Sequence, residues 1–266
     1  MNARRAGALW ILAGTFASSA WGAATEKVFV TCPVYRDTNA GRKSGCWLAT
    51  DEAVGIRYDI SLSRTKPQRG HEVLVEARLP STSSASAASS AQSPCGGLTL
   101  EPVVVSVLDS LCPSFMLPAE SYPGRRFRLD PRLVLGTADV PETLPPGPYQ
   151  PRTWHIEFAY QSDFLQYQYS EVILDEIGRY VRASHPRTVE VTGYAVTQAR
   201  EVSGHRLAEQ ASLAQARADM VALALERLGA SEAIVKVSAR ENPEPLSTDG
   251  ELPEPSRRRV DIHLSY

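Results

Sequence analysis

The segment TVEVTGYAVTQ, residues 188–198, decides the fold of the second half of this 266-residue chain. Val189, Val191 and Gly193 alternate with more polar residues, as in a half-buried β-strand. A polar loop follows, and the helical pattern SLAQARADMVALALERLG comes next at residues 212–229. A strand that leads through a polar loop to the N-terminus of a helix is a common way to build an anion site.

The segments on both sides of this strand continue the alternation of strands and helices. Strand patterns occupy residues 152–165, 233–241 and 257–266, and a helix pattern occupies residues 170–186. The order β-α-β-α-β-β predicts an α/β sandwich with both helices on one mixed sheet. Helical periodicity in the second helix points five residues toward that sheet: Leu213, Met220, Val221, Ala224 and Leu228.

The first half contains strand patterns separated by turn signals, and it shows no convincing amphipathic helix. The strand-like runs are KVFVTC, GIRYDISL, HEVLVEARL, LTLEPVVVSVL and RRFRL. They predict a β domain over residues 25–137, either a sandwich or a partial barrel. Residues 81–93 lack apolar side chains larger than alanine, so we expect a solvated loop, and the prolines of residues 138–152 predict a linker. The fold class expected for the whole chain is α+β.

The N-terminus has the layout of a secretory signal peptide. A charged MNARR precedes the apolar AGALWILAGTFASS, and small residues follow, so residues 1–24 are expected to be removed on export. An uncleaved membrane anchor is the alternative, but the apolar run is short for a spanning helix.

The four cysteines fit an exported chain, because an even number in an oxidising compartment implies disulfides. The preferred pairing joins Cys32 to Cys46 and Cys95 to Cys112, since each pair flanks a short segment. A loop of that size stabilises a fold by roughly 3 kcal/mol in the chain-entropy model. Zinc is the competing interpretation, and the cysteine spacings are too wide for paired CxxC knuckles. We therefore expect no metal site.

The second half resembles the OmpA-like peptidoglycan-binding domains. The resemblance lies in EFAYQSDFL, VTGYAV, LAQARADMVALAL and RRRVDI, and it covers about residues 153–266. It implies that the domain holds a diamino acid of the peptidoglycan stem noncovalently. In the family, an aspartate that ends the second strand and an arginine on the second helix grip the ammonium and the carboxylate of that ligand.

The resemblance transfers a ligand-binding role to six residues, Arg217, Gly193, Tyr194, Gln210, Leu213 and Arg258. Val196 stands where the family has its aspartate, and a valine can neither accept a hydrogen bond nor neutralise a charge. A desolvated ammonium without its partner costs about 1–3 kcal/mol, which weakens binding roughly tenfold or more.

Arg217 lies near a helix N-terminus, where a positive charge is unfavourable unless an anion answers it. A ligand carboxylate is one candidate for this anion. An internal acid is the other, and Glu201, Glu209 or Asp249 could supply it. The loop before the helix is longer than is usual in the family, so Glu201 or Glu209 could also replace the missing aspartate.

A net charge of −2 and the lack of nucleic-acid, nucleotide or hydrolase motifs argue against nucleic-acid partners, a cofactor and catalytic residues. The leading hypothesis is a non-enzymatic protein of a Gram-negative-type cell envelope, in the periplasm or at the outer-membrane periphery. Its C-terminal domain would contact peptidoglycan weakly or in altered form, and its β domain would bind an envelope protein. The alternatives are a degenerate OmpA-like scaffold for protein–protein assembly and a periplasmic enzyme.

Overall fold

A computed structural model describes residues 26–38, 45–80, 92–119, 144–166, 169–247 and 251–266. The predicted signal peptide, most of the Ser/Ala-rich segment and the predicted strand RRFRL lie outside the described residues. None of the described helices has the length and apolar character needed to cross a membrane.

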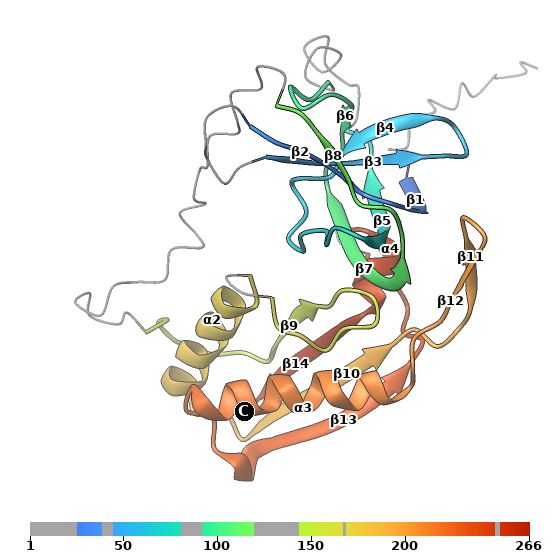
Figure 1. Cartoon of the computed structure of the whole chain (residues 1–266). Coiled ribbons are helices and arrows are strands. Elements are labelled where there is room, and N and C mark those ends of the chain that lie inside the picture. Colours follow the sequence, from blue (N-terminus) through green and yellow to red (C-terminus); the bar gives the residue numbers. More distant parts are fainter. Residues whose placement is uncertain (1–25, 39–44, 81–91, 120–143, 167–168, 248–250) are drawn as a thin grey trace, which may run out of the picture.

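The N-terminal part consists of two β-sheets that share a core, so the sandwich is the form that the β domain takes (Figure 1). One sheet has the strand order β1-β5-β7 and the other β6-β4-β3-β2-β8. The strands are β1 (Glu26–Thr31), β2 (Val34–Arg36), β3 (Cys46–Asp51), β4 (Ile56–Asp59), β5 (His71–Arg78), β6 (Leu98–Thr99), β7 (Val103–Leu111) and β8 (Phe115–Leu117).

Strand β5 is the central strand of its sheet and is buried on both faces. Val73, Val75 and Ala77 enter the core between the two sheets. Leu74 lies on the opposite face, in a second apolar cluster that contains residues from the C-terminal part of the chain. The residue that follows on that face is Glu76, which is 1% exposed. A buried carboxylate needs a partner, and its partner comes from the other domain.

The C-terminal part has one mixed sheet with the order β13-β10-β14-β9, and helices α2 and α3 cover one face of it (Figure 1). The elements are β9 (Arg152–Glu157), α2 (Tyr169–Ser184), β10 (Thr188–Ala195), β11 (Arg200–Val202), β12 (His205–Leu207), α3 (Ser212–Arg227), η2 (Glu232–Ile234), β13 (Val235–Glu241), α4 (Pro253–Arg257) and β14 (Arg259–Ser265). The predicted β-α-β-α-β-β order is confirmed, with one hairpin and two short helices added to it.

The face that helix α3 presents to the sheet agrees only in part with the prediction. Val221 is buried as predicted, and Ala224 and Leu228 pack against the core. Met220, in contrast, is 39% exposed and Leu213 is only half-buried, whereas Ala214 and Ala218 are buried. Small side chains face the sheet because α3 lies very close to strand β10 at Gly193. Hydrophobicity alone favoured the larger residues, and the close approach of the two backbones selects the alanines instead.

Gly193→Ala is expected to lower the free energy of unfolding by about 3 kcal/mol, near the upper end of the usual range for overpacked cores. A Cβ at position 193 would lie 2.0 Å from the carbonyl oxygen of Ala214 and 2.9 Å from the Cβ of Ala218. Urea denaturation measures the effect. Ser238→Ala, on the exposed strand β13, is the control and should change stability by less than about 0.5 kcal/mol. Equal effects of the two substitutions would contradict the close approach.

The predicted polar loop between β10 and α3 contains a β-hairpin. Strands β11 and β12 pair through the two-residue turn Ser203-Gly204, in which both residues have positive φ. Such a turn matches the twist of a hairpin, so the sequence VSGH carried a signal for it. Val202 and Leu207, on one face of the hairpin, are buried against Leu74 of β5.

Candidate functional site

Arg217 lies in the second turn of α3 and is completely buried, and Glu209 neutralises it. The guanidinium donates to both carboxylate oxygens of Glu209, with Nη2 2.5 Å from Oε1 and Nη1 3.0 Å from Oε2. Three further hydrogen bonds go to the backbone carbonyl oxygens of Ala159, Ser162 and Tyr194. These contacts engage all five N–H donors that a guanidinium has.

Glu209 is equally well satisfied. Its carboxylate accepts hydrogen bonds from the backbone N–H of Gln161 at 3.1 Å and from that of Val196 at 2.8 Å. Val196, which stands at the family's aspartate, is itself buried. The internal acid expected among three candidates is therefore Glu209; Glu201 is exposed on β11, and Asp249 lies outside the described residues.

The second predicted arginine, Arg258, is also buried and paired with a carboxylate. Its guanidinium donates to both oxygens of Glu76, which lies on β5 of the other domain. Arg200, on the hairpin, donates to the same carboxylate. Burial alone would raise the pKa of Glu76, but the charges and hydrogen bonds of Arg258 and Arg200 outweigh it and lower that pKa below its ordinary value.

The two domains therefore meet at the end of the C-terminal domain that carries these arginines. Besides the ion pairs, an apolar cluster joins the domains, and its buried members are Val30, Leu74, Leu108, Val202 and Leu207. Ser203 at the hairpin turn accepts a hydrogen bond from the backbone N–H of Val30. Ser106 of β7 accepts one from the backbone N–H of Tyr160. Hydrophobic burial, ion pairs and hydrogen bonds thus all contribute to the domain joint.

The other predicted site residues lie around this joint in different environments. Gln210 is exposed and Leu213 half-buried, and both line a cavity of about 380 Å³ that Asp109 of β7 also lines. Gly193 is buried under α3. The ring of Tyr194 is half-buried, with the guanidinium carbon of Arg259 4.9 Å from its centre. The structure thus does not gather the six residues into one open pocket.

The cysteines of the β domain pair differently from the preferred prediction. Cys46 forms a disulfide with Cys95, so the pairing of Cys32 with Cys46 and of Cys95 with Cys112 was wrong. The prediction considered only the length of chain between cysteines. Pairing of β4 with both β3 and β6 brings Cys46 and the turn before β6 together, although the two cysteines have a sequence separation of 49.

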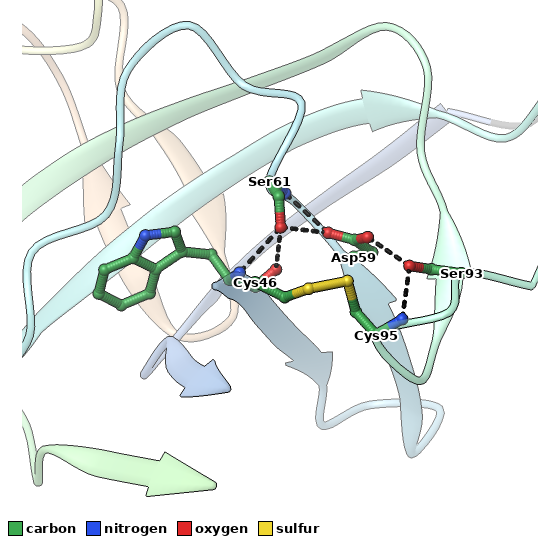
Figure 2. Close-up of a disulfide and its surroundings, with 6 residues drawn as sticks. Cys46, Asp59, Ser61, Ser93 and Cys95 are labelled. Atoms are coloured by element: carbon green, nitrogen blue, oxygen red, sulfur yellow. Dashed lines mark hydrogen bonds between the residues drawn. A yellow bond between two sulfur atoms is a disulfide. The ribbon is translucent and has the colours of Figure 1, made fainter. Parts of the chain in front are cut away.

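The disulfide lies beside a buried carboxylate, as Figure 2 shows. Asp59 accepts hydrogen bonds from the side chains of Ser61 and Ser93, each at 2.5 Å, and from the backbone N–H of Ser61 at 2.9 Å. Cys46, Asp59 and Cys95 are the one group of potential metal ligands found among the described residues. Both sulfur atoms belong to the disulfide and are not available as thiolate ligands.

The comparisons with known proteins concern the C-terminal half. The OmpA family model matches residues 157–259, less than half of the chain, and confirms the predicted resemblance of this half to OmpA-like domains. The search of curated proteins found no match.

Among solved structures, the cell wall anchor of the T6SS from Pseudomonas aeruginosa is 24% identical, with 43% of this chain and 81% of that chain covered and a TM-score of 0.34. The peptidoglycan-associated lipoprotein from Burkholderia pseudomallei is 24% identical, with 42% and 89% covered and a TM-score of 0.32. The OmpA-like domain of FopA1 from Francisella tularensis is 19% identical, with 42% and 71% covered and a TM-score of 0.34.

Proposed function

We propose that this chain is a non-enzymatic scaffold of the cell envelope, in which the OmpA-like domain serves protein–protein assembly rather than anchoring to peptidoglycan through its arginines. One observation carries the proposal. Glu209 neutralises Arg217 from inside the domain, and Glu76 of the β-sandwich neutralises Arg258. The two charges that the family resemblance would offer to a ligand are thus paired within the chain.

Energetics favour this interpretation over binding of a diamino acid at Arg217. A ligand carboxylate would have to displace Glu209 and leave it buried without its cation. Leaving a buried charge unpaired costs about 3–5 kcal/mol, which is a factor of 10² or more in affinity. At the position of the ammonium partner, the buried Val196 supplies no compensating charge.

Contact with peptidoglycan at a neighbouring position is the second candidate, and one observation favours it. The cavity of about 380 Å³ beside Gln210 and Leu213 is lined by Asp109, whose exposed carboxylate comes from the β-sandwich. An ammonium group could meet its counter-charge there. This candidate needs no displacement of Glu209, so it is distinguishable from binding at Arg217.

Co-sedimentation with purified sacculi tests the proposal. We expect both the exported protein and its Asp109→Asn variant to remain in the supernatant, because Arg217 and Arg258 stay paired with Glu209 and Glu76 and are not available to a ligand. Sedimentation of the wild type that Asp109→Asn reduces tenfold or more would establish wall contact at the cavity. Sedimentation unaffected by Asp109→Asn would place wall binding on another surface, and either result would overturn the scaffold proposal. Cross-linking in intact envelopes should then give a species heavier than the exported monomer, and recovery of the monomer alone would also contradict the scaffold proposal.

A further inference from the structure

The two cysteines outside the disulfide lie at the same end of the β1-β5-β7 sheet, on either side of β5. Cys32 directly follows β1, whose last residue, Thr31, is paired with Val73. Cys112 directly follows β7, and its backbone N–H donates to the carbonyl oxygen of Gly70 at 3.0 Å. Both cysteines therefore flank the first residues of the same central strand.

The two thiols also lie on the same face of that sheet. Continuing the β1–β5 register places Cys32 opposite Glu72, and Ser110 donates to the Glu72 carboxylate at 2.6 Å. Alternate residues of a strand share a face, which puts Cys112 on the side of Ser110. The two thiols interact there, because Cys32 acts together with burial to raise the pKa of the Cys112 thiol.

We propose that Cys32 and Cys112 form a second disulfide in the exported protein. Both side chains are half-buried rather than sealed, so a small oxidant or an oxidoreductase can reach them. Cys46 and Cys95 are already joined to each other, so Cys32 and Cys112 are the two cysteines that remain to pair. An oxidising compartment, which the predicted signal peptide implies, converts such a contact into a covalent bond.

The reaction is a thiol–disulfide exchange with an external disulfide, such as oxidised glutathione or an oxidoreductase. Burial, followed by the interaction with Cys32, raises the pKa of the Cys112 thiol to about 12. One of the two protein thiols loses its proton and attacks the external disulfide, forming a mixed disulfide and releasing one thiol of the oxidant. The other protein thiol then gives up its proton, attacks the protein sulfur of the mixed disulfide and releases the second thiol. Two protein thiols are oxidised and one external disulfide is reduced.

Alkylation of the unfolded, non-reduced protein tests the proposal. We expect no labelled cysteine in protein isolated from the exported compartment and a proteolytic peptide pair that joins Cys32 to Cys112. Cys112→Ser should expose one labelled thiol at Cys32. The matched variant Cys95→Ser should expose one thiol at Cys46 and leave the Cys32–Cys112 peptide pair intact.

Two results would overturn the second disulfide. One is two labelled thiols, at Cys32 and Cys112, in the exported protein and also after incubation of the folded protein with oxidised glutathione. The other is a peptide pair that joins Cys32 or Cys112 to a cysteine of the first disulfide. The variants report on bond formation through peptide mapping, so a partial loss of stability in either one does not obscure the result.

Discussion

Arg217→Ala lowers the free energy of unfolding by about 3–5 kcal/mol, the usual cost of removing one partner from a buried ion pair. The substitution leaves the Glu209 carboxylate without its cation in a site closed to water. It also leaves three backbone carbonyl oxygens, those of Ala159, Ser162 and Tyr194, without their donors. Desolvation of the orphaned carboxylate is the larger part of the cost.

Urea denaturation of the full chain measures this effect, and Arg227→Ala is the control because Arg227 is exposed on the same helix. The control is expected to change stability by less than about 0.5 kcal/mol. The double variant Arg217→Met with Glu209→Met should lose less than the sum of the single variants, since it removes both charges together. Additive losses, or an Arg217→Ala variant as stable as the control, would show that the pair does not hold the site closed.

Glu76→Gln is expected to lower the free energy of unfolding by a similar amount, about 3–5 kcal/mol. Arg258 is fully buried, and among the described residues Glu76 is the only carboxylate that forms an ion pair with it. The substitution also removes the carboxylate from Arg200, so the joint between the domains loses its shared anion. We expect the two domains to unfold in separate transitions, which different spectroscopic probes will report at different urea concentrations.

Glu26→Gln is the matched control, because Glu26 pairs with Arg78 at the surface and such pairs contribute less than about 1 kcal/mol. The pH dependence gives a second measurement. The folded pKa of Glu76 lies below its ordinary value of 4.5, so its stabilisation is complete above that pH and is lost as the pH falls through the folded pKa. The stability gap between wild type and Glu76→Gln should narrow below pH 4.5; a gap independent of pH would contradict the ionised pair.

The architecture of the C-terminal half was predictable because its signals are local. Alternation in TVEVTGYAV and helical spacing in residues 212–229 each depend on neighbouring residues, and the order of such elements constrains the sheet. The closed state of the site was not predictable to the same degree. Glu209 was one of three candidate acids, and only the packing of the loop under Val196 selects it.

Glu76 and the cysteine pairing could not be predicted, for a common physical reason. Both depend on contacts between segments far apart in the chain, such as Cys46 and Cys95, whose sequence separation is 49. Glu76 gave a faint signal, as an acid inside the apolar run VLVEA, but nothing local identifies Arg258 as its partner. The hairpin was different, since Ser203-Gly204 between Val202 and His205 is a recognisable turn.

The hairpin of β11 and β12 has a mechanical consequence. It reaches from the sheet of one domain to the outer face of β5 in the other, where Val202 and Leu207 are held between apolar neighbours. Two domains connected only by a proline-rich linker would reorient freely, whereas this contact fixes the angle between them. The two domains are thus held in one relative orientation, and partners bound to their opposite ends would be kept at a constant spacing and orientation.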